Sequence, residues 1–269
     1  MTGTTTGPVA LLAGWVARQA SPAGRAWLEA GVAQIPTLDE RVQTALLGMA
    51  ARNLGRDALA LDGADLAAAD RSRPGWRPAG LTLADAGRLV LLASSHGGNG
   101  AALAARLLFL CRTGDLGEVI GYYRGLPILP EPQELLPVAH EGVRSAMQPV
   151  FDAVALHSPF PAEMFDEDSW NQLVLKSLFI GSSLLSIQGL DDRANPRLAT
   201  TLVDYAHERW SAGRPVSPEL WRCVGRFAGD YEMAALRRAT ESDDPAERDA
   251  ARACIPAHRS RPRTVSSLA

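Results

Sequence analysis

Four times along the chain a helix-capping residue stands directly before a proline: Ser21-Pro22, Asn195-Pro196, Ser217-Pro218 and Asp244-Pro245. A capping oxygen accepts a hydrogen bond from a free backbone N–H in the first helical turn. Proline at the first helical position has no N–H to leave unpaired. Each pair therefore predicts the start of a helix. Thr37-Leu-Asp-Glu40 and Thr82-Leu-Ala-Asp85 resemble capping boxes and predict two more.

Apolar residues follow these starts at the helical period. One stripe runs from Leu38 to Leu54, and a second, over residues 135–154, predicts a single long helix. No stretch sustains the period-two alternation of apolar and polar residues that is typical of a half-buried strand. We therefore predict an all-α fold of at least eight helices. It is either an irregular helical bundle or a set of HEAT-like stacked helical hairpins.

The segment 125–137 holds four prolines in thirteen residues and is the clearest internal boundary. It predicts an N-terminal helical lobe over residues 1–124 and a C-terminal helical lobe over residues 138–256. A second irregular stretch, 70–78, carries Trp76, which we expect to fold back on the core. Residues 257–269 lack an apolar stripe and are predicted to be disordered.

Composition excludes several classes of protein. The formal net charge is -3 and the arginines are scattered among acids, so we expect no nucleic-acid partner. The three cysteines lie far apart in sequence and predict buried thiols in a reducing compartment, with neither a disulfide nor a zinc site. No apolar run reaches the roughly 18 residues of a membrane span, and the N-terminus lacks the charge of a signal peptide. We therefore expect a cytoplasmic protein with no transmembrane segment, metal or cofactor.

Residues 89–103 superficially resemble the glycine turn with which dinucleotide-binding folds hold a pyrophosphate. In the register that begins at Gly98, however, the third glycine position is Leu103, and no further strands follow. We interpret the segment as a tight helix-to-helix turn in which Asn99 caps the second helix. His140-Glu141 begins like a zinc-protease helix, but the next ligand position is Arg144, which cannot bind a metal.

Lys176 is the only lysine in the chain and stands inside the apolar run 173–180, which predicts a central helix. If the side chain is buried, it needs a carboxylate from elsewhere in the fold; otherwise it reaches the surface along its own stem. Arg209 repeats the pattern, because it falls inside the apolar arc of the predicted helix 197–211 and would need a buried acid. The acids near Lys176 in sequence are Glu163, Asp166, Asp191, Asp192 and Asp204.

These cations and the acid-rich loop 189–196 form either a structural ion network or the lining of a pocket for an anionic ligand. His157, on a turn stiffened by two prolines, is expected near the rim. The residues that we nominate as a ligand-binding pocket are His157, Glu163, Asp166, Trp170, Asn171, Lys176, Asp191, Arg193 and Arg209.

Four motifs in series, over 157–176, 187–196, 204–210 and 218–222, together resemble the EboA family. The resemblance covers roughly residues 150 to 227. It implies a gene cluster that also encodes a prenyltransferase of the UbiA type, a dehydroquinate-synthase-like cyclase and a TIM-barrel metal hydrolase. In cyanobacteria such clusters are tied to moving a scytonemin precursor out of the cytoplasm. The resemblance supplies no reaction and no catalytic residues.

Two hypotheses follow. In the first, the protein is a helical accessory factor of a small-molecule biosynthesis or export pathway, whose metabolites are prenylated or cyclitol-derived. It would bind an intermediate or another protein of the cluster. In the second, it is an enzyme that uses Lys176 for proton transfer or Schiff-base chemistry, with His157 or Glu163 as the partner. The sequence does not predict an oligomeric state.

Overall fold

The structure is a computed structural model that describes residues 7–259, with side chains described as far as residue 255. Within these residues no strand forms, and the only β-type pairing is an isolated bridge between Ala58 and Thr82. The predicted all-α fold is therefore confirmed. The chain divides into two compact units, Met1–Phe165 and Asp166–Ala269.

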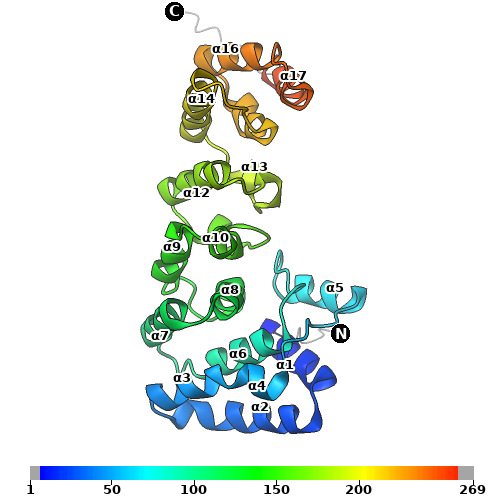
Figure 1. The fold of residues 1–269 in the computed structure, drawn as a ribbon, viewed down its shortest axis with the longest axis vertical. Coiled ribbons are helices and arrows are strands. Elements are labelled where there is room, and N and C mark those ends of the chain that lie inside the picture. The colour runs from blue at the N-terminus through cyan, green and yellow to red at the C-terminus, as the bar shows by residue number, and fades with distance from the viewer. Residues whose placement is uncertain (1–6, 260–269) are drawn as a thin grey trace, which may run out of the picture. The chain divides into compact units, whose positions relative to one another are not determined.

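The α-helices of the first unit are α1 (Pro8–Gln19), α2 (Pro22–Gln34), α3 (Glu40–Gly48), α4 (Ala50–Leu54), α5 (Gly63–Ser72), α6 (Leu83–Ser94), α7 (Gly100–Thr113), α8 (Leu116–Arg124), α9 (Leu136–Arg144), α10 (Gln148–Ala155) and α11 (Phe160–Met164) (Figure 1). Two short 3-10 helices join them, η1 (Ile35–Thr37) and η2 (Leu126–Ile128).

The second unit contains α12 (Glu167–Ile180), α13 (Leu190–Arg193), α14 (Pro196–Ser211), α15 (Trp221–Val224), α16 (Asp230–Ala239) and α17 (Pro245–Arg259). Its 3-10 helices are η3 (Leu184–Ser186), η4 (Pro218–Leu220) and η5 (Gly225–Phe227). The predicted disordered segment 257–269 overlaps the end of α17, and its last ten residues lie outside the described part of the chain. None of the described helices is long and apolar enough to cross a lipid bilayer.

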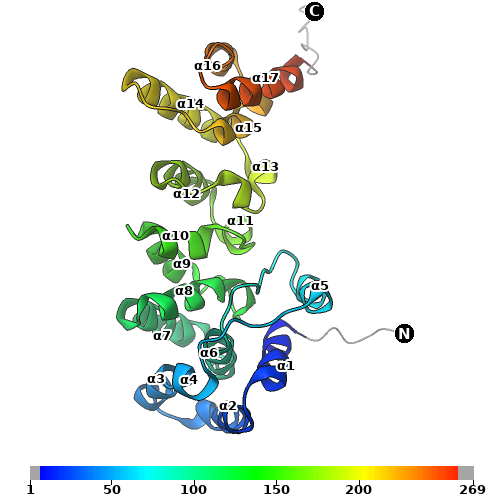
Figure 2. The ribbon, with the colours of Figure 1, turned by 45° about the vertical axis from the view of Figure 1, so that its right-hand side comes forward.

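Helix α6 forms the centre of the first unit. It packs against α1, α2, α4 and α8 (Figure 2), and every residue from 83 to 92 except Asp85 is buried. A helix that is apolar on nearly every side is stable only when neighbours cover all of its faces. Gly87 permits a close contact with α4, because a Cβ atom there would lie 2.1 Å from Cδ1 of Leu54.

The segment 125–137 lies inside the first unit, so the chain does not divide there. Its apolar side chains, among them Leu126, Ile128, Leu129 and Leu135, are buried. The prolines therefore turn the chain within a packed core instead of joining two lobes through an exposed linker. The division follows Phe165, where no cluster of prolines or glycines marks it in the sequence.

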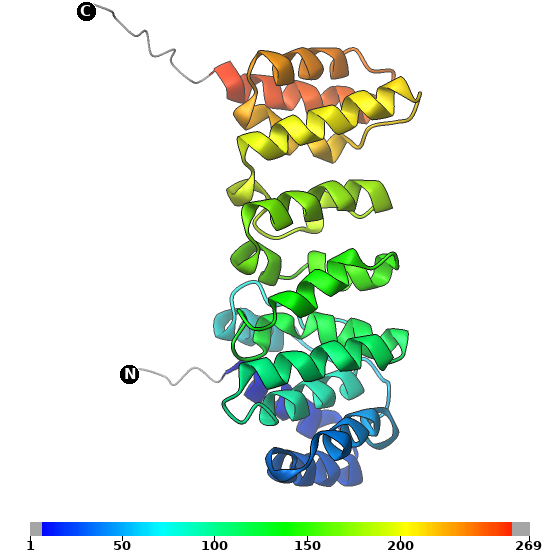
Figure 3. The same cartoon turned by 90° about the vertical axis from the view of Figure 1, so that its left-hand side faces the viewer.

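The long helix predicted over 135–154 is wrong, because α9 ends at Arg144 and α10 begins at Gln148. Pro149 explains the break. In the first turn of α10 a backbone N–H has no partner within the helix, so proline loses no hydrogen bond there. Inside a continuous helix the proline would remove a hydrogen bond and clash with the preceding turn. Oγ of Ser145 accepts a hydrogen bond from the Met147 backbone N–H at 3.1 Å within the turn. Helices α7 to α10 follow one another through the first unit (Figure 3).

Most predicted helix starts are confirmed. The side chains of Ser21, Thr82, Asn99 and Asn195 each accept the capping hydrogen bond, and the Thr82 box includes Asp85 as its partner. The glycine-rich segment before α7 is thus the helix-to-helix turn that we predicted. Two starts differ, at Ser217 and at Thr37. Ser217-Pro218 opens the 3-10 helix η4 instead of an α-helix.

The capping box predicted at Thr37 is wrong. Helix α3 begins two residues later than a Thr37 cap requires, and its cap is Asp39, whose Oδ1 accepts from the Val42 N–H at 2.9 Å. The Thr37 hydroxyl donates to the Gln34 carbonyl at 2.8 Å and so closes the preceding turn. An aspartate oxygen caps a free N–H as well as a threonine hydroxyl does, so Asp39 can take the role that we assigned to Thr37.

In the second unit α14 packs against α12, α15 and α16, and α17 covers α15 and α16. The expectation that residues 173–180 form a central helix is wrong. Helix α12 buries Trp170, Leu173 and Val174 on one side, whereas Phe179 is 59% exposed. Within this unit α12 packs on α14 and η3, which do not cover its whole surface.

Candidate functional site

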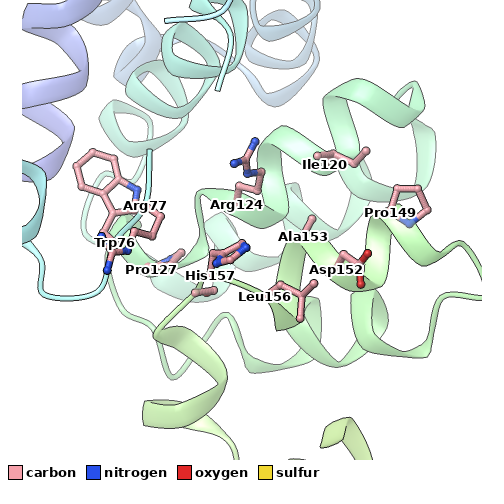
Figure 4. Close-up of a pocket in the computed structure, with 11 residues that line it drawn as sticks. Trp76, Arg77, Ile120, Arg124, Pro127, Pro149, Asp152, Ala153, Leu156 and His157 are labelled. Carbon is pink, nitrogen blue, oxygen red and sulfur yellow. The ribbon is translucent and has the colours of Figure 1, made fainter. Parts of the chain in front are cut away.

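A pocket of about 270 Å³ lies in the first unit (Figure 4). Its walls come from four places: the irregular segment 73–80, the C-terminal half of α8, η2, and α10 with the turn that follows it. Five polar side chains line it, Arg77, Arg124, Asp152, His157 and Ser158, and the indole of Trp76 forms part of one wall. The remaining lining is largely apolar.

Three contacts hold the first half of the segment 73–80 in place as a wall, and Arg73 makes two of them. Its Nε donates to the Pro127 carbonyl at 2.8 Å, and its Nη1 donates to Oε1 of Glu163 at 2.8 Å. The third is Trp76, which is 2% exposed and stacks on Trp15 of α1 with ring centroids 5.8 Å apart. The prediction that Trp76 folds back on the core is confirmed. Glu163, nominated as a ligand-binding residue, does not line the pocket but pairs with Arg73.

Arg124, at the end of α8, both lines the pocket and fastens its wall. Its Nη1 donates to the Gly80 carbonyl at 2.9 Å and its Nη2 to the Ala79 carbonyl at 2.5 Å. Gly80 has φ of +84°, a left-handed conformation that glycine adopts without strain. Burial lowers the pKa of Arg124, since neutral carbonyls replace the water around its charge.

His157 lines this pocket and is the nominated residue that does so. It follows α10, its side chain is exposed, and its φ of +54° lies in the left-handed region. Such a conformation costs a non-glycine residue roughly 1 kcal/mol or more and persists only where the surrounding chain enforces it. The next residue, Ser158, is buried, and its Oγ accepts from the Phe160 N–H at 3.3 Å, which holds the turn.

The other nominated residues lie in the second unit. Lys176 is half-buried on α12, between the two alternatives that the sequence left open, and burial lowers the pKa of its ammonium group. Asp166 caps the same helix, accepting from the Ser169 N–H at 2.7 Å. This hydrogen bond gives Asp166 a structural role at the start of α12.

Trp170, Asn171 and Arg193 form a packed polar cluster between α12, α13 and the start of α14. The guanidinium carbon of Arg193 lies 4.9 Å from the centroid of the buried Trp170 ring. Asn171 and Asn195 exchange amide hydrogen bonds of 2.8 and 3.3 Å. Because Asn195 also caps α14, this exchange ties α12 to the start of that helix.

Asp191 is paired with Arg222, whose Nε donates to Oδ1 at 2.5 Å. This hydrogen bond raises the pKa of Arg222, and the pair lines a small pocket of about 190 Å³. Arg209 has no carboxylate within 4.0 Å among the described residues. Its Nε donates to the Pro215 carbonyl at 3.0 Å and its guanidinium lies over the Tyr205 ring, so a backbone oxygen stands where we expected a buried acid.

The cysteines are free thiols, but of the three that we predicted to be buried only Cys223 is fully so, and Cys111 and Cys254 are partly exposed. Burial raises the pKa of Cys111 and of Cys223 to about 12 in each case. Thiols that stay protonated at neutral pH are poor nucleophiles and poor metal ligands. Among the described residues, no group of three or more histidine, cysteine, aspartate or glutamate side chains could hold a metal ion.

Of the residues that line the first-unit pocket, sequence reasoning nominated only His157 and missed the rest, among them Trp76, Arg77, Arg124 and Asp152. Trp76 was assigned to the core, but its role as a wall was not foreseen. The only signal for the others is weak. Arg77 follows a tryptophan in an irregular segment, and Arg124 ends a helix, where a cation is unremarkable because it complements the helix dipole.

The family model described as "Metabolite traffic protein EboA" matches residues 9–225 of the chain. The match reaches well before the motifs at 157–222 and covers the whole of the first-unit pocket. No curated protein and no solved structure shows detectable similarity to the chain.

Proposed function

The chain belongs to the EboA family, and we propose that it binds a small-molecule intermediate in the pocket of its first unit. The family description is in keeping with an accessory role in a metabolite pathway. A concave, largely apolar site with a few convergent polar groups is the usual form of a small-molecule site. We further propose that the intermediate is prenylated or cyclitol-derived, as the family resemblance implies. We also propose that the protein is cytoplasmic, which the free thiols support.

One observation carries this proposal. The indole Nε1–H of Trp76 is buried in the pocket wall and has no hydrogen-bond partner among the described residues. A buried donor left without an acceptor costs about 1–3 kcal/mol, so such groups are uncommon in folded proteins. A ligand acceptor in the adjoining pocket would satisfy it. In Figure 4 the nitrogen edge of the indole faces the side on which Arg77 and His157 lie.

The polar groups of the pocket favour binding over catalysis. Among the described residues, no thiol or primary amine lines the pocket, and the hydroxyl of Ser158 is buried and accepts a hydrogen bond from the Phe160 N–H. Arginine and indole side chains, which make up much of the remaining polar lining, donate hydrogen bonds and do not act as nucleophiles. We propose that the protein holds an intermediate and passes it to another protein of the pathway.

Native mass spectrometry of protein purified from its host would test the proposal. Leu156→Trp fills the pocket from one wall, whereas Phe179→Trp adds a similar ring at an exposed position of the second unit. We expect a bound small molecule on the wild type and on Phe179→Trp but not on Leu156→Trp. A wild type that carries no small molecule, or a Leu156→Trp variant that retains it, would count against this function.

A second candidate function is catalysis by Lys176, supported by the burial that lowers the pKa of its amine and so raises the fraction able to attack a carbonyl. Lys176 is the only lysine, so borohydride trapping can give an adduct only there or at the N-terminus. Incubation with host extract and borohydride, followed by peptide mapping, should then give an adduct on the wild type and none at position 176 of Lys176→Arg. Absence of the adduct from wild type would remove this candidate.

A further inference from the structure

The charged groups of the first-unit pocket leave one positive charge in excess. The lining contains two guanidinium groups, from Arg77 and Arg124, and one carboxylate, from Asp152, while His157 adds an imidazole (Figure 4). A ligand with one negative charge would balance the site when the imidazole is neutral. A dianion would leave one negative charge uncompensated beside Asp152.

Arg124 has donors left for such a ligand. The two hydrogen bonds to the carbonyls of Ala79 and Gly80 use two of the five N–H groups of its guanidinium. Neither carbonyl carries a charge, and Asp85, the acid whose charge acts on Arg124, does not line the pocket. A ligand carboxylate beside the guanidinium would add a second counter-charge.

Arg77 stands at the mouth of the pocket with an exposed side chain. It is carried by the segment 73–80, and the contacts of Arg73, Trp76 and Arg124 fix the backbone on both sides of it. The segment therefore presents a second guanidinium to the pocket from a held backbone. Arginine is the usual partner for carboxylates because its planar fork matches their two oxygens.

The unpartnered indole N–H of Trp76 points to the same chemistry, because it can only donate. An oxygen acceptor satisfies it, whereas an ammonium or a hydrocarbon does not. Apart from Ser158, the rest of the lining, including Ile120, Pro127, Pro149 and Leu156, is apolar. The volume is about nine times the ~30 Å³ that one water occupies in the liquid, which suits one ring with one acid group.

We propose that the occupant of this pocket is an organic monocarboxylate with a flat apolar body. Its carboxylate binds Arg77 and Arg124 and accepts from the indole N–H of Trp76, while its body lies against the apolar wall. This inference rests on the proposed function and narrows the class of ligand.

Sodium benzoate is the smallest probe with this chemistry, and benzyl alcohol and phenyl phosphate are its neutral and dianionic counterparts. The full chain labelled with ¹⁵N gives an indole resonance for each of its six tryptophans, and Trp76→Phe identifies the one from Trp76. We expect benzoate to shift the Trp76 resonance, with a Kd at least tenfold below the Kd of either counterpart. Equal or tighter binding of benzyl alcohol would overturn the acid preference, and tighter binding of phenyl phosphate would overturn the single charge.

Two matched variants test the role of Arg77. Arg77→Gln should raise the Kd for benzoate at least fivefold and leave that for benzyl alcohol within about twofold. Arg71→Gln, an exposed arginine on α5 outside the pocket, should change neither. If Arg77→Gln behaves like Arg71→Gln, the proposed carboxylate position is wrong. If no probe shifts the Trp76 resonance, the inference fails, while the proposed function is still judged by the comparison of Leu156→Trp with Phe179→Trp.

His157→Gly separates binding from folding. Glycine adopts the left-handed backbone at this position without strain, so the melting temperature should not fall. We expect benzoate to bind at least threefold more weakly, because one donor at the mouth is lost. Unchanged benzoate binding would mean that His157 takes no part in holding the acid group.

Discussion

Arg73 and Glu163, ninety residues apart in sequence, form a two-point ion pair that fastens the pocket wall 73–80 to α11. Neither residue lines the pocket. Their pairing fixes the backbone that carries Trp76 and Arg77, so its effect on a ligand is indirect and passes through the position of the wall.

Glu163→Gln should therefore weaken ligand binding without touching the pocket lining. Because Glu163 is 43% exposed, we expect the free energy of unfolding to fall by no more than about 1 kcal/mol. The Kd for benzoate should rise about threefold. Isothermal denaturation and the Trp76 indole shift measure the two effects, and Glu134→Gln, another exposed acid of the first unit, is the control.

Lys176→Met and Arg88→Met form a matched pair for buried charge. Arg88 is 4% exposed and pairs with Asp85 and Glu118, so its loss strands two acids and should cost about 3–5 kcal/mol of unfolding free energy. Lys176 is only half-buried, and its replacement should change the same quantity by less than about 1 kcal/mol. Urea denaturation midpoints compare the two. A larger loss for Lys176→Met would show that its ammonium group has an essential partner.

A single methyl group added between α4 and α6 should lower the stability of the fold. At Gly87 a Cβ atom would lie 2.1 Å from Leu54, so Gly87→Ala should lower the unfolding free energy by about 1–3 kcal/mol. Gly14 lies inside α1 with no atom near its Cβ position, and Gly14→Ala should raise it by about 0.5–1 kcal/mol. Thermal denaturation of both variants gives the comparison, and equal effects would contradict the packing of α6.

Stability should fall in alkali because buried thiols resist ionisation. Burial raises the pKa of Cys223 from 9.0 to about 12, so between these pH values the unfolded chain has lost a proton that the folded chain keeps. The unfolding free energy then decreases as pH rises, by about 1.4 kcal/mol per pH unit for each such thiol. Cys223→Ala should make the decline between pH 9 and pH 12 shallower. An unchanged slope would mean that Cys223 ionises in the folded protein.

The sequence predicted local features of the fold better than it predicted the pocket. Caps at Ser21, Thr82 and Asn195 are decided by hydrogen bonds within three residues, so the pattern of residue types is enough to identify them. The break at Pro149 was also local, but the apolar stripe continued across it and outweighed it. Burial of α12 was overestimated, because a stripe shows which side is apolar but not how many neighbours cover it.

The candidate site could be predicted only in part, for a different physical reason. His157 was nominated from its stiff turn, and it does line a pocket. Its companions there, Arg77 and Arg124, come from segments that lie 80 and 33 residues earlier in the chain. Residues that meet only through tertiary packing leave no common spacing in the sequence. Glu163 was nominated as a ligand contact, but it forms an ion pair with Arg73. That pairing could not be predicted without the fold.

The segment 73–80 is attached to the helices around it by a few side chains, those of Arg73 and Trp76 and, from the other side, Arg124. Helices α8 and α10 pack against each other independently of it. A substitution or insertion between these attachment points would reshape the pocket while the helical framework stays as it is. Ligand preference in this architecture can therefore diversify through one short stretch of chain, with little penalty to folding.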